Sequence, residues 1–217
     1  MECCSGGSRC IDAERQFGAE VAARDLARYR RKGPDAASRL LLSSVRNQLR
    51  HGDSLLDIGA GVGALDFELL SMGASGTTLV DASPAYLEAA RRETQQRNVV
   101  DRVQFVTGDF ARLGGTIPPA DVVTMHRVVC CYADYASLLE SAAKHARRLL
   151  AFSFPRDRWD IRGWLAINNT RRRVLGNGFQ VYVHPPAAME RLILKAGFKR
   201  VGRGTTFVWS IDVYARS

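Results

Sequence analysis

Three glycines alternate along one short segment, Gly59, Gly61 and Gly63, directly after an apolar run that carries Asp57. Because glycine has no side chain, such a backbone can turn tightly and approach a ligand closely. Asp81 ends the next predicted strand. A carboxylate at that position can accept hydrogen bonds from both hydroxyls of a ribose. The pattern predicts a site for a nucleoside-type cofactor at the carboxyl ends of parallel strands.

Two further carboxylates belong to the same predicted site. Asp109 ends the third predicted strand, where it can accept a hydrogen bond from an adenine amine, while the neighbouring backbone and the Phe110 ring border the base. Asp57 can pair with a cationic ligand through an amine or a water. The alternative for Asp57 is a carboxylate that is hydrogen-bonded to amides of the glycine loop.

The glycine loop alone does not identify the ligand. The spacing Gly59-x-Gly61-x-x-Ala64 also satisfies the dinucleotide fingerprint, so an NAD-binding oxidoreductase is a rival interpretation. Asp57 argues against it, because a carboxylate there would face a pyrophosphate unfavourably. Asp109 supplies a second hydrogen-bond acceptor, on the side of the adenine base, which an NAD-binding site does not need. A non-catalytic cofactor-binding module is the other alternative.

Candidate catalytic groups follow the fourth predicted strand. His126 can act as a general base, because an imidazole titrates near neutral pH, or it can position and pack at the strand end. Tyr132 is a second candidate base if the acceptor arrives protonated. Tyr29 can lie over the cofactor if the N-terminal helices form a lid, or it can pack.

Four residues are candidates for substrate binding. Arg127, Arg156 and Arg158 can hold a carboxylate or phosphate, which arginine matches bidentately, or they can be solvated surface residues. His184 can face the substrate, and its place before two prolines also suits a helix start. No group of acidic residues and histidines has the spacing of a metal site, so no metal is expected.

Short apolar strands alternate with helices along most of the chain, which predicts a Rossmann-like α/β fold with a mostly parallel sheet and helices on both faces. A terminal hairpin adds an antiparallel last strand, which gives seven strands in all. The predicted strands are 54–58, 77–80, 103–106, 121–125, 149–154, 199–205 and 207–215. The predicted helices are 12–31, one around 41–49, 65–72, 84–97, 134–147 and 185–196.

The expected organisation is an N-terminal arm and lid helix over residues 1–35 and one domain over 36–217. Residues 156–180 fit no element and are interpreted as an insertion on the substrate side.

Composition narrows the class of protein. The 217 residues carry a net charge of +9, and two basic segments, 24–50 and 144–173, could act together on an anionic substrate, a membrane surface or nucleic acid. No apolar run is long enough to span a membrane, and no secretory signal is visible. The five cysteines favour a reduced, cytoplasmic setting. Zinc binding by Cys3, Cys4 and Cys10 is not favoured, because their spacing is unusual and no histidine is near.

Three segments occur in order and resemble the first three cofactor motifs of class I S-adenosylmethionine-dependent methyltransferases: LLDIGAGVGAL, LVDAS and VTGDF. The resemblance covers roughly residues 36–217. It implies S-adenosylmethionine as cofactor, with S-adenosylhomocysteine as product. It also implies roles for particular residues: Gly59, Gly61 and Gly63 near the methionine part, Asp81 with Ala82 at the ribose, Asp109 and Phe110 at adenine, and His126 at the site of methyl transfer.

Two other segments, ADVVTMHRVVCCYADY and AFSFPRDRW, are similar to a bacterial subgroup labelled magnesium-protoporphyrin O-methyltransferase-like. The expected reaction is direct displacement, in which an acceptor heteroatom attacks the sulfonium methyl group. The expected acceptor is a small molecule, and the basic segments favour an anionic one. An RNA or protein methyltransferase is the alternative, although the Asn-Pro-Pro-Tyr/Phe and Pro-Cys motifs of base-modifying enzymes are absent.

Overall fold

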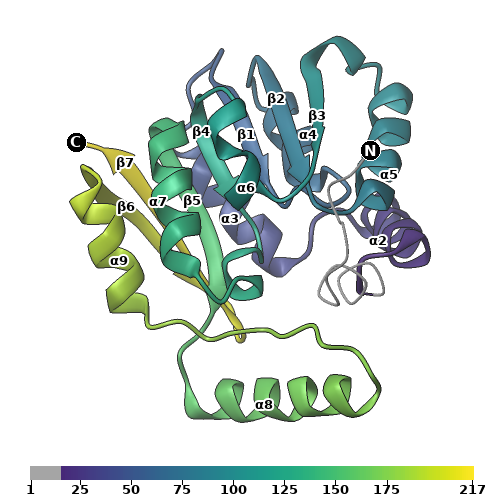
Figure 1. Cartoon of the computed structure of the whole chain (residues 1–217). Helices are drawn as coiled ribbons and strands as arrows, with labels where there is room; N and C mark the ends of the chain where they lie inside the picture. Colours follow the sequence, from purple (N-terminus) through teal and green to yellow (C-terminus); the bar gives the residue numbers. More distant parts are fainter. Residues whose placement is uncertain (1–15) are drawn as a thin grey trace.

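One mixed sheet runs through the molecule, and the computed structural model describes it within residues 16–217 (Figure 1). Its seven strands are β1 Ser54–Ile58, β2 Gly76–Asp81, β3 Val103–Thr107, β4 Ala120–Met125, β5 Ala146–Pro155, β6 Phe198–Thr205 and β7 Trp209–Arg216. They lie in the order β3-β2-β1-β4-β5-β7-β6. Neighbours from β3 to β5 are parallel, and β7 is antiparallel to β5 and β6. The predicted sheet with its reversed last strand is confirmed.

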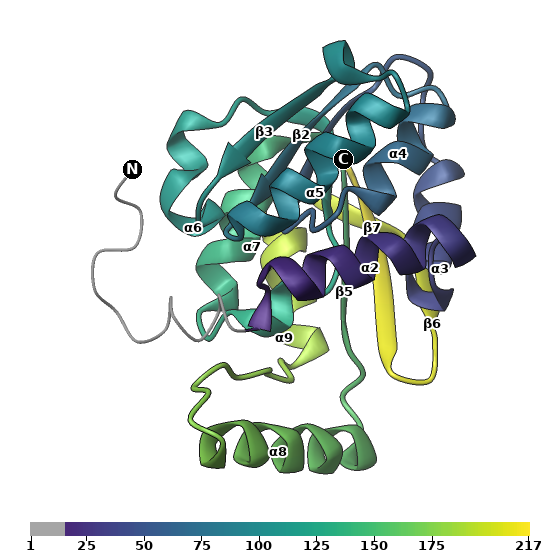
Figure 2. The same ribbon diagram turned by 90° about the vertical axis from the view of Figure 1, so that its right-hand side faces the viewer.

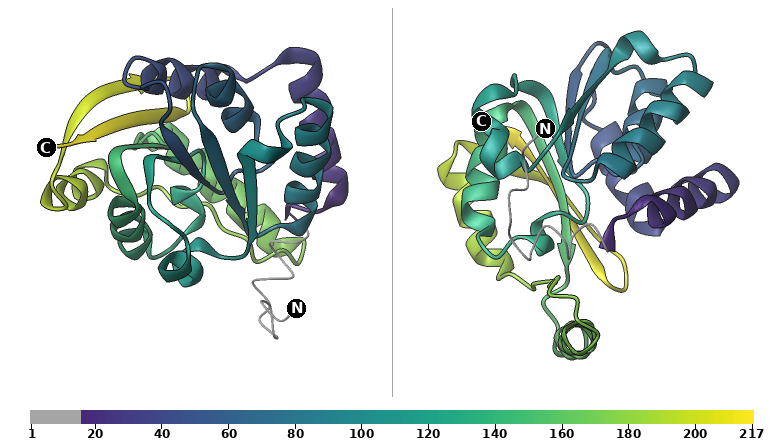
Figure 3. Two further views of the ribbon diagram at one scale, coloured as in Figure 1. Left: turned by 90° about the horizontal axis from the view of Figure 1, so that it is seen from above. Right: turned by 45° about the vertical axis from the view of Figure 1, so that its right-hand side comes forward.

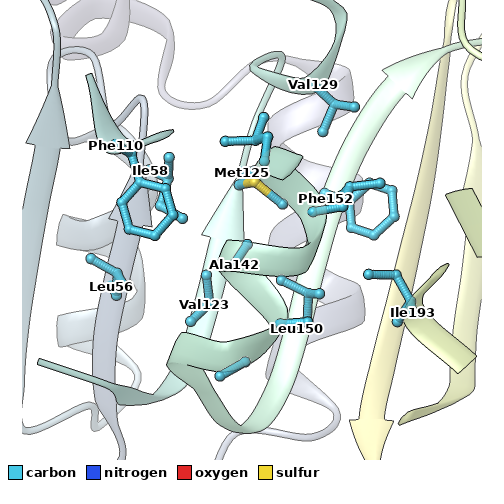
Figure 4. Packing of buried hydrophobic residues seen from close by; sticks show 14 of the residues in the cluster. Leu56, Ile58, Phe110, Val123, Met125, Val129, Ala142, Leu150, Phe152 and Ile193 are labelled. Atoms are coloured by element: carbon cyan, nitrogen blue, oxygen red, sulfur yellow. The ribbon is translucent and has the colours of Figure 1, made fainter. Parts of the chain in front are cut away.

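The central strands are apolar on both faces because helices cover both. Leu56 and Val123 are neighbours on β1 and β4, and Leu150 follows on β5, so the three side chains form a row on one face (Figure 4). Their sequence neighbours Leu55 and Val122 belong to the cluster on the opposite face. A strand that is buried on both sides reads as a continuous apolar run, which is why these strands are visible in the sequence.

Helices form a layer on each side of the sheet (Figure 3). The cluster around Leu56 includes residues of α6 (Phe110–Leu113), α7 (Tyr135–His145) and α9 (Pro186–Lys195). The cluster around Leu55 includes residues of α3 (Ala36–Arg46), α4 (Ala64–Ser71) and α5 (Pro84–Gln96). The expectation of helices on both faces is therefore confirmed.

The N-terminal helix α2 (Ala19–Lys32) packs against α5 (Figure 2). Ala22, Leu26 and Tyr29 are its buried residues, and they share a cluster with Phe67 of α4. The helix is thus joined to the body by an apolar face. The expected helix began at residue 12, and residues 12–15 lie outside the described part of the chain, as do Cys3, Cys4 and Cys10.

Two elements differ from the sequence-based expectation. Helix α7 ends at His145, and β5 already begins at Ala146, which pairs with Ala120 of β4. Strand pairing therefore overrides the helical tendency of residues 146–147. The insertion contains a long helix, α8 (Trp159–Val174), of which only Ile161 and Leu165 are buried. The helix was missed because its apolar residues do not mark a face that turns toward the core.

Helix α8 lies beyond the end of β5, at the edge where the parallel strands end (Figures 1 and 2). We call this edge the carboxyl edge. Among the described residues, no helix has the length and apolar character needed to cross a bilayer.

Two adjacent residues of α9 test the core. Ile193 is fully buried, whereas Leu194 is 45% exposed. Ile193→Ala is expected to lower the free energy of unfolding by roughly 2–5 kcal/mol, because it removes buried methyl groups and leaves a cavity. Leu194→Ala should change it by less than about 0.5 kcal/mol. Urea denaturation measures both, and equal losses would contradict the assigned register of the helix.

Candidate functional site

The glycine loop is held at the end of β2 by backbone contacts. The amides of Gly59 and Ala60 donate to the Val80 carbonyl at 2.7 and 3.2 Å. Gly59, Gly61 and Gly63 have φ values of 70°, 57° and 75°, in the left-handed region that favours glycine. A Cβ atom at Gly59 would lie 2.3 Å from Cγ2 of Val128. Both conformation and space therefore require glycine at that position.

Asp81 joins this loop to the next one. Its Oδ2 accepts a hydrogen bond from the Gly61 amide at 2.8 Å, and its Oδ1 accepts one from the Ser83 amide at 2.8 Å. Burial raises the pKa of Asp81, while the two amide bonds favour the ionised form. Each oxygen of a carboxylate has two acceptor positions, so each retains one for a ribose hydroxyl. Ala82 is exposed in the same turn.

Asp109 lies next to Asp81 across the carboxyl edge, because the Gly108 amide donates to the Asp81 carbonyl at 2.9 Å. Its Oδ1 accepts hydrogen bonds from the Tyr132 hydroxyl at 2.6 Å and from the Ala111 amide at 3.0 Å. The structure gives no support to the expectation that the Phe110 ring borders the base. Phe110 as a whole is 1% exposed, and its side chain belongs to the core cluster around Leu56.

Tyr132 is placed as a hydrogen-bond donor rather than as a base. Burial and the bond to Asp109 raise the pKa of its hydroxyl, so it remains protonated at neutral pH. Tyr29 is a packing residue: it is 3% exposed, its hydroxyl donates to Glu68 at 2.8 Å, and its ring stacks on Phe67. These contacts support the packing alternative for Tyr29 over a position above the cofactor.

Asp57 lies beneath the loop and forms a buried pair with Asp66 of α4. Asp57 is 2% exposed and accepts a hydrogen bond from the Thr124 hydroxyl at 2.6 Å. Burial, and then the charge of Asp66, raise its pKa. Burial also raises the pKa of Asp66 to about 6, although the Thr77 hydroxyl donates to it. The expected contact of Asp57 with a cationic ligand is therefore not supported, because its carboxylate is turned into the core.

His126 is held between two serine hydroxyls. Its Nδ1 lies 3.0 Å from Ser153 Oγ, and its Nε2 lies 3.1 Å from Ser38 Oγ. Ser153 Oγ also accepts from the Arg127 amide, and Ser38 Oγ donates to Asp35. Each serine has one proton, so these contacts assign a neutral imidazole that donates through Nε2 and accepts at Nδ1.

The electrostatics of His126 agree with this assignment. Burial, and then the charge of Arg127, lower its pKa to about 3. Neither ring nitrogen is free to take a proton from an acceptor unless a serine bond breaks. The geometry therefore supports a positioning role for His126 over that of a general base.

Two of the three candidate arginines already have a carboxylate partner. Arg127 donates to Asp35 at 2.6 Å, and Arg158 donates to Asp160 at 2.8 Å. Arg156 donates to the Thr206 carbonyl at 3.2 Å. Among the contacts of residues 16–217, Arg156 has no carboxylate partner, so its charge remains available for an anionic group.

Asp35 connects the network of His126 to helix α3. It accepts from the Ser38 amide at 2.9 Å as N-cap and pairs with Arg127. Burial alone would raise its pKa, but the amide and the guanidinium outweigh this effect and lower it to about 2. The start of α3 is thereby fixed against the end of β4.

The chain that follows α8 returns over the carboxyl edge. The Tyr182 amide donates to the Cys130 carbonyl at 2.7 Å, and His184 Nε2 lies 3.2 Å from the Val129 carbonyl. The ring of Phe179 contacts that of Phe17, whose carbonyl accepts from Ser83 Oγ. The N-terminal segment and the insertion thus meet over this edge. His184 is buried and serves as an anchor, which supports its structural role over a substrate contact.

The unfolding free energy should report the neutral state of His126. Its pKa is about 3 in the folded protein, against 6.5 for an unperturbed histidine. The unfolded chain therefore binds the proton first, so this contribution is fully present above pH 6.5 and is lost as the pH falls toward 3. Between pH 6.5 and pH 3 the unfolding free energy of the wild type should fall more steeply with decreasing pH than that of His126→Asn. The two slopes should differ by up to about 1.4 kcal/mol per pH unit. Parallel slopes in urea titrations would contradict the assignment.

Comparison with known proteins bears on the family and the fold of this chain. Residues 56–150 match a family model described as a methyltransferase domain. Ribosomal protein L11 methyltransferase from Exiguobacterium sp. (strain ATCC BAA-1283 / AT1b) is 29% identical over 80 residues, which is 37% of this chain and 26% of that protein. The match thus spans about a quarter of the length of these curated relatives.

Solved structures resemble the whole chain. Magnesium protoporphyrin IX methyltransferase from Synechocystis PCC 6803 with bound S-adenosylmethionine has a TM-score of 0.71 at 18% identity, and 100% of each chain is covered. An O-methyltransferase family protein from Burkholderia thailandensis also has a TM-score of 0.71, at 19% identity, over 94% of this chain and 62% of that one. At these identities the likeness shows the fold. The matched family model identifies residues 56–150 as part of a methyltransferase domain, and the fold and the three cofactor motifs are consistent with the class I S-adenosylmethionine-dependent type.

Proposed function

We propose that this protein transfers a methyl group from S-adenosylmethionine to a small-molecule acceptor. The observation that carries the proposal is the Asp81 carboxylate, which holds the Gly61 amide at 2.8 Å and keeps acceptor positions for a diol. Asp109 lies beside it; its Oδ1 accepts from Tyr132, and its Oδ2 lies 3.8 Å from Arg112 Nε. The residues present therefore fit a nucleoside whose amino-acid tail lies along the glycine loop.

When bound, the cofactor supplies an already activated sulfonium methyl group. The task left to the chain is to bind and align two reactants, and such alignment can contribute about 7–11 kcal/mol in favourable systems. His126 suits this task, because the two serines fix its ring. We propose that it orients the acceptor rather than removing its proton. Tyr132 supports Asp109 in the same way.

Two observations support a small acceptor. The insertion and Phe17 close over the carboxyl edge through the contact between Phe17 and Phe179, which limits the room for a macromolecule. Arg156 offers a charge for an anionic group of the acceptor. The relatives that methylate ribosomal protein L11 favour a protein acceptor instead. That match covers only 80 residues, 26% of the relative's length, and proteins that share a fold can act on different acceptors.

Binding measurements separate the cofactor classes. Calorimetric titration with S-adenosylhomocysteine is expected to give micromolar affinity, and NAD⁺ is expected not to bind. NAD⁺ binding would support the oxidoreductase alternative. If S-adenosylhomocysteine binds, tritiated S-adenosylmethionine should label small carboxylic acids or phenols and not ribosomal protein or RNA. Labelling of protein would overturn the small-molecule part of the proposal. Binding without transfer to any acceptor would favour the non-catalytic module.

Asp81→Asn tests the placement of the ribose. The variant keeps the size of the side chain but loses its charge and places an amide donor near two backbone donors. Affinity for S-adenosylhomocysteine should fall by roughly 1.5–3 kcal/mol, the range for a hydrogen bond to a charged group. Asp101→Asn is the control, because this exposed residue precedes β3 at the opposite end of the sheet. Equal affinities for the two folded variants would contradict the proposed ribose contact.

A further inference from the structure

The exposed apolar side chains of this molecule are unevenly distributed. Nine large apolar residues are exposed among the described ones, and six of these lie on or beside α8. Trp159 is 85% exposed and Val174 is 80% exposed. The six residues are Trp159, Trp164, Ile167, Val174, Leu175 and Phe207. We call them the α8 face.

Helical geometry brings most of these residues onto one side of the helix. Trp164, Ile167 and Val174 follow one another at intervals of three and seven residues, which places them on one stripe. Ile161 and Leu165 point the other way and are buried. Ile167, Val174 and Leu175 also line an open groove of about 560 Å³. The stripe is therefore turned away from the body of the molecule. The right-hand view of Figure 3 shows α8 set apart from the sheet and the helices that cover it.

Phe207 extends the face beyond the helix. It is 71% exposed and lies in the turn between β6 and β7. The Arg158 guanidinium lies 5.6 Å from the centre of the Phe207 ring. Arg158 is the residue directly before α8, which starts at Trp159. The exposed turn and the start of the helix are thus neighbours, although they are far apart in the sequence.

Positive charge lies at the C-terminal end of the α8 face. Arg171, Arg172 and Arg173 occupy the last turn of the helix. Within the described residues, no carboxylate forms an ion pair with any of these three arginines. Basic residues at a helix C-terminus also complement its dipole, but this does not account for the exposed tryptophans. A helix with tryptophan and aliphatic residues on one side and arginines beside them suits the surface of an anionic membrane.

Two other occupants fit the α8 face less well. In a symmetric antiparallel pair of α8 helices, the arginines of one copy would face the start of the other. The carboxylates there, Asp157 and Asp160, already pair with arginines of their own chain, so they would not balance the added charge. Nucleic acid could stack on tryptophan and contact arginine, but it offers nothing to Ile167, Val174 and Leu175. A bilayer satisfies both features, because its acyl chains accept the aliphatic side chains and its head groups accept the arginines.

We propose that the α8 face docks on an anionic lipid surface, with α8 lying in the plane of the interface. Because α8 lies beyond the carboxyl edge, this orientation turns the edge that carries the glycine loop toward the bilayer. The association is peripheral and reversible. It does not depend on the identity of the cofactor or the acceptor.

Sedimentation with vesicles tests this proposal on the full chain. Wild-type protein should sediment with vesicles of phosphatidylcholine and phosphatidylglycerol in equal parts, and much less with phosphatidylcholine alone. Added salt should weaken this binding. The emission of Trp159 and Trp164 should shift to shorter wavelength on binding. No preference for the anionic vesicles would overturn the proposal.

Three variants locate the contact. Trp164→Ser combined with Ile167→Ser should lower the partition coefficient by about tenfold or more, because it removes buried apolar surface. Arg171→Glu with Arg173→Glu should lower it by about tenfold or more by reversing the charge near the head groups. Leu194→Ser with Val201→Ser is the control, because these exposed apolar residues lie on α9 and β6.

The controls also separate the other occupants. Circular dichroism and urea midpoints establish that each variant is folded, and S-adenosylhomocysteine affinity should not change in any of them. Equal vesicle binding by all three variants would overturn the proposal. A concentration-dependent dimer in light scattering that only the α8 variants abolish would instead assign the face to a second copy. Salt-dependent binding to polyuridylate without vesicle binding would assign it to nucleic acid.

Discussion

The site depends on one carboxylate that accepts two backbone amides from different loops. Asp81 binds the Gly61 amide at 2.8 Å and the Ser83 amide at 2.8 Å, so a single side chain sets the distance between the loop after β1 and the loop after β2. Its own carbonyl accepts from Gly108 in the loop after β3. A change of this side chain would therefore affect the relative placement of the loops after β1 and β2, while the backbone contact with the loop after β3 would remain. This explains why the geometry needs a short acidic side chain there.

A second network fixes the other side of the site and leaves its central group without charge. The Arg127 amide, Ser153, His126, Ser38 and Asp35 form a continuous chain of hydrogen bonds from β5 to the start of α3. Every polar group in this chain has a partner, and burial keeps the imidazole neutral. Such satisfied networks hold side chains in one arrangement. A rigid network with a neutral imidazole at its centre suits a reaction in which the methyl donor is already activated and alignment matters most.

Much of the fold could be predicted from the sequence, because its strands are buried on both faces and its turns contain glycine. The candidate cofactor-binding residues Gly59 and Asp81 could also be predicted, because each stands in a motif at the end of a recognisable strand. Ser38 and Ser153 could not be predicted as parts of the site. Nothing in the sequence around a serine in a helix or a strand shows that the fold brings it next to His126. Helix α8 was missed for a different reason: only two of its apolar residues are buried and most of the others face outward, so no sustained periodicity links the helix to the core.

We propose that Asp81 joins the glycine loop to the ribose of a bound nucleoside. The most direct measurement is the amide spectrum of ¹⁵N-labelled protein during titration with S-adenosylhomocysteine. We expect the Gly61 and Ser83 amide resonances to be among those that shift most, because both amides donate to the carboxylate that is proposed to receive the ribose. Saturable binding that leaves these two resonances unchanged while others move would contradict the proposal, and the cofactor would have to be placed elsewhere on the fold.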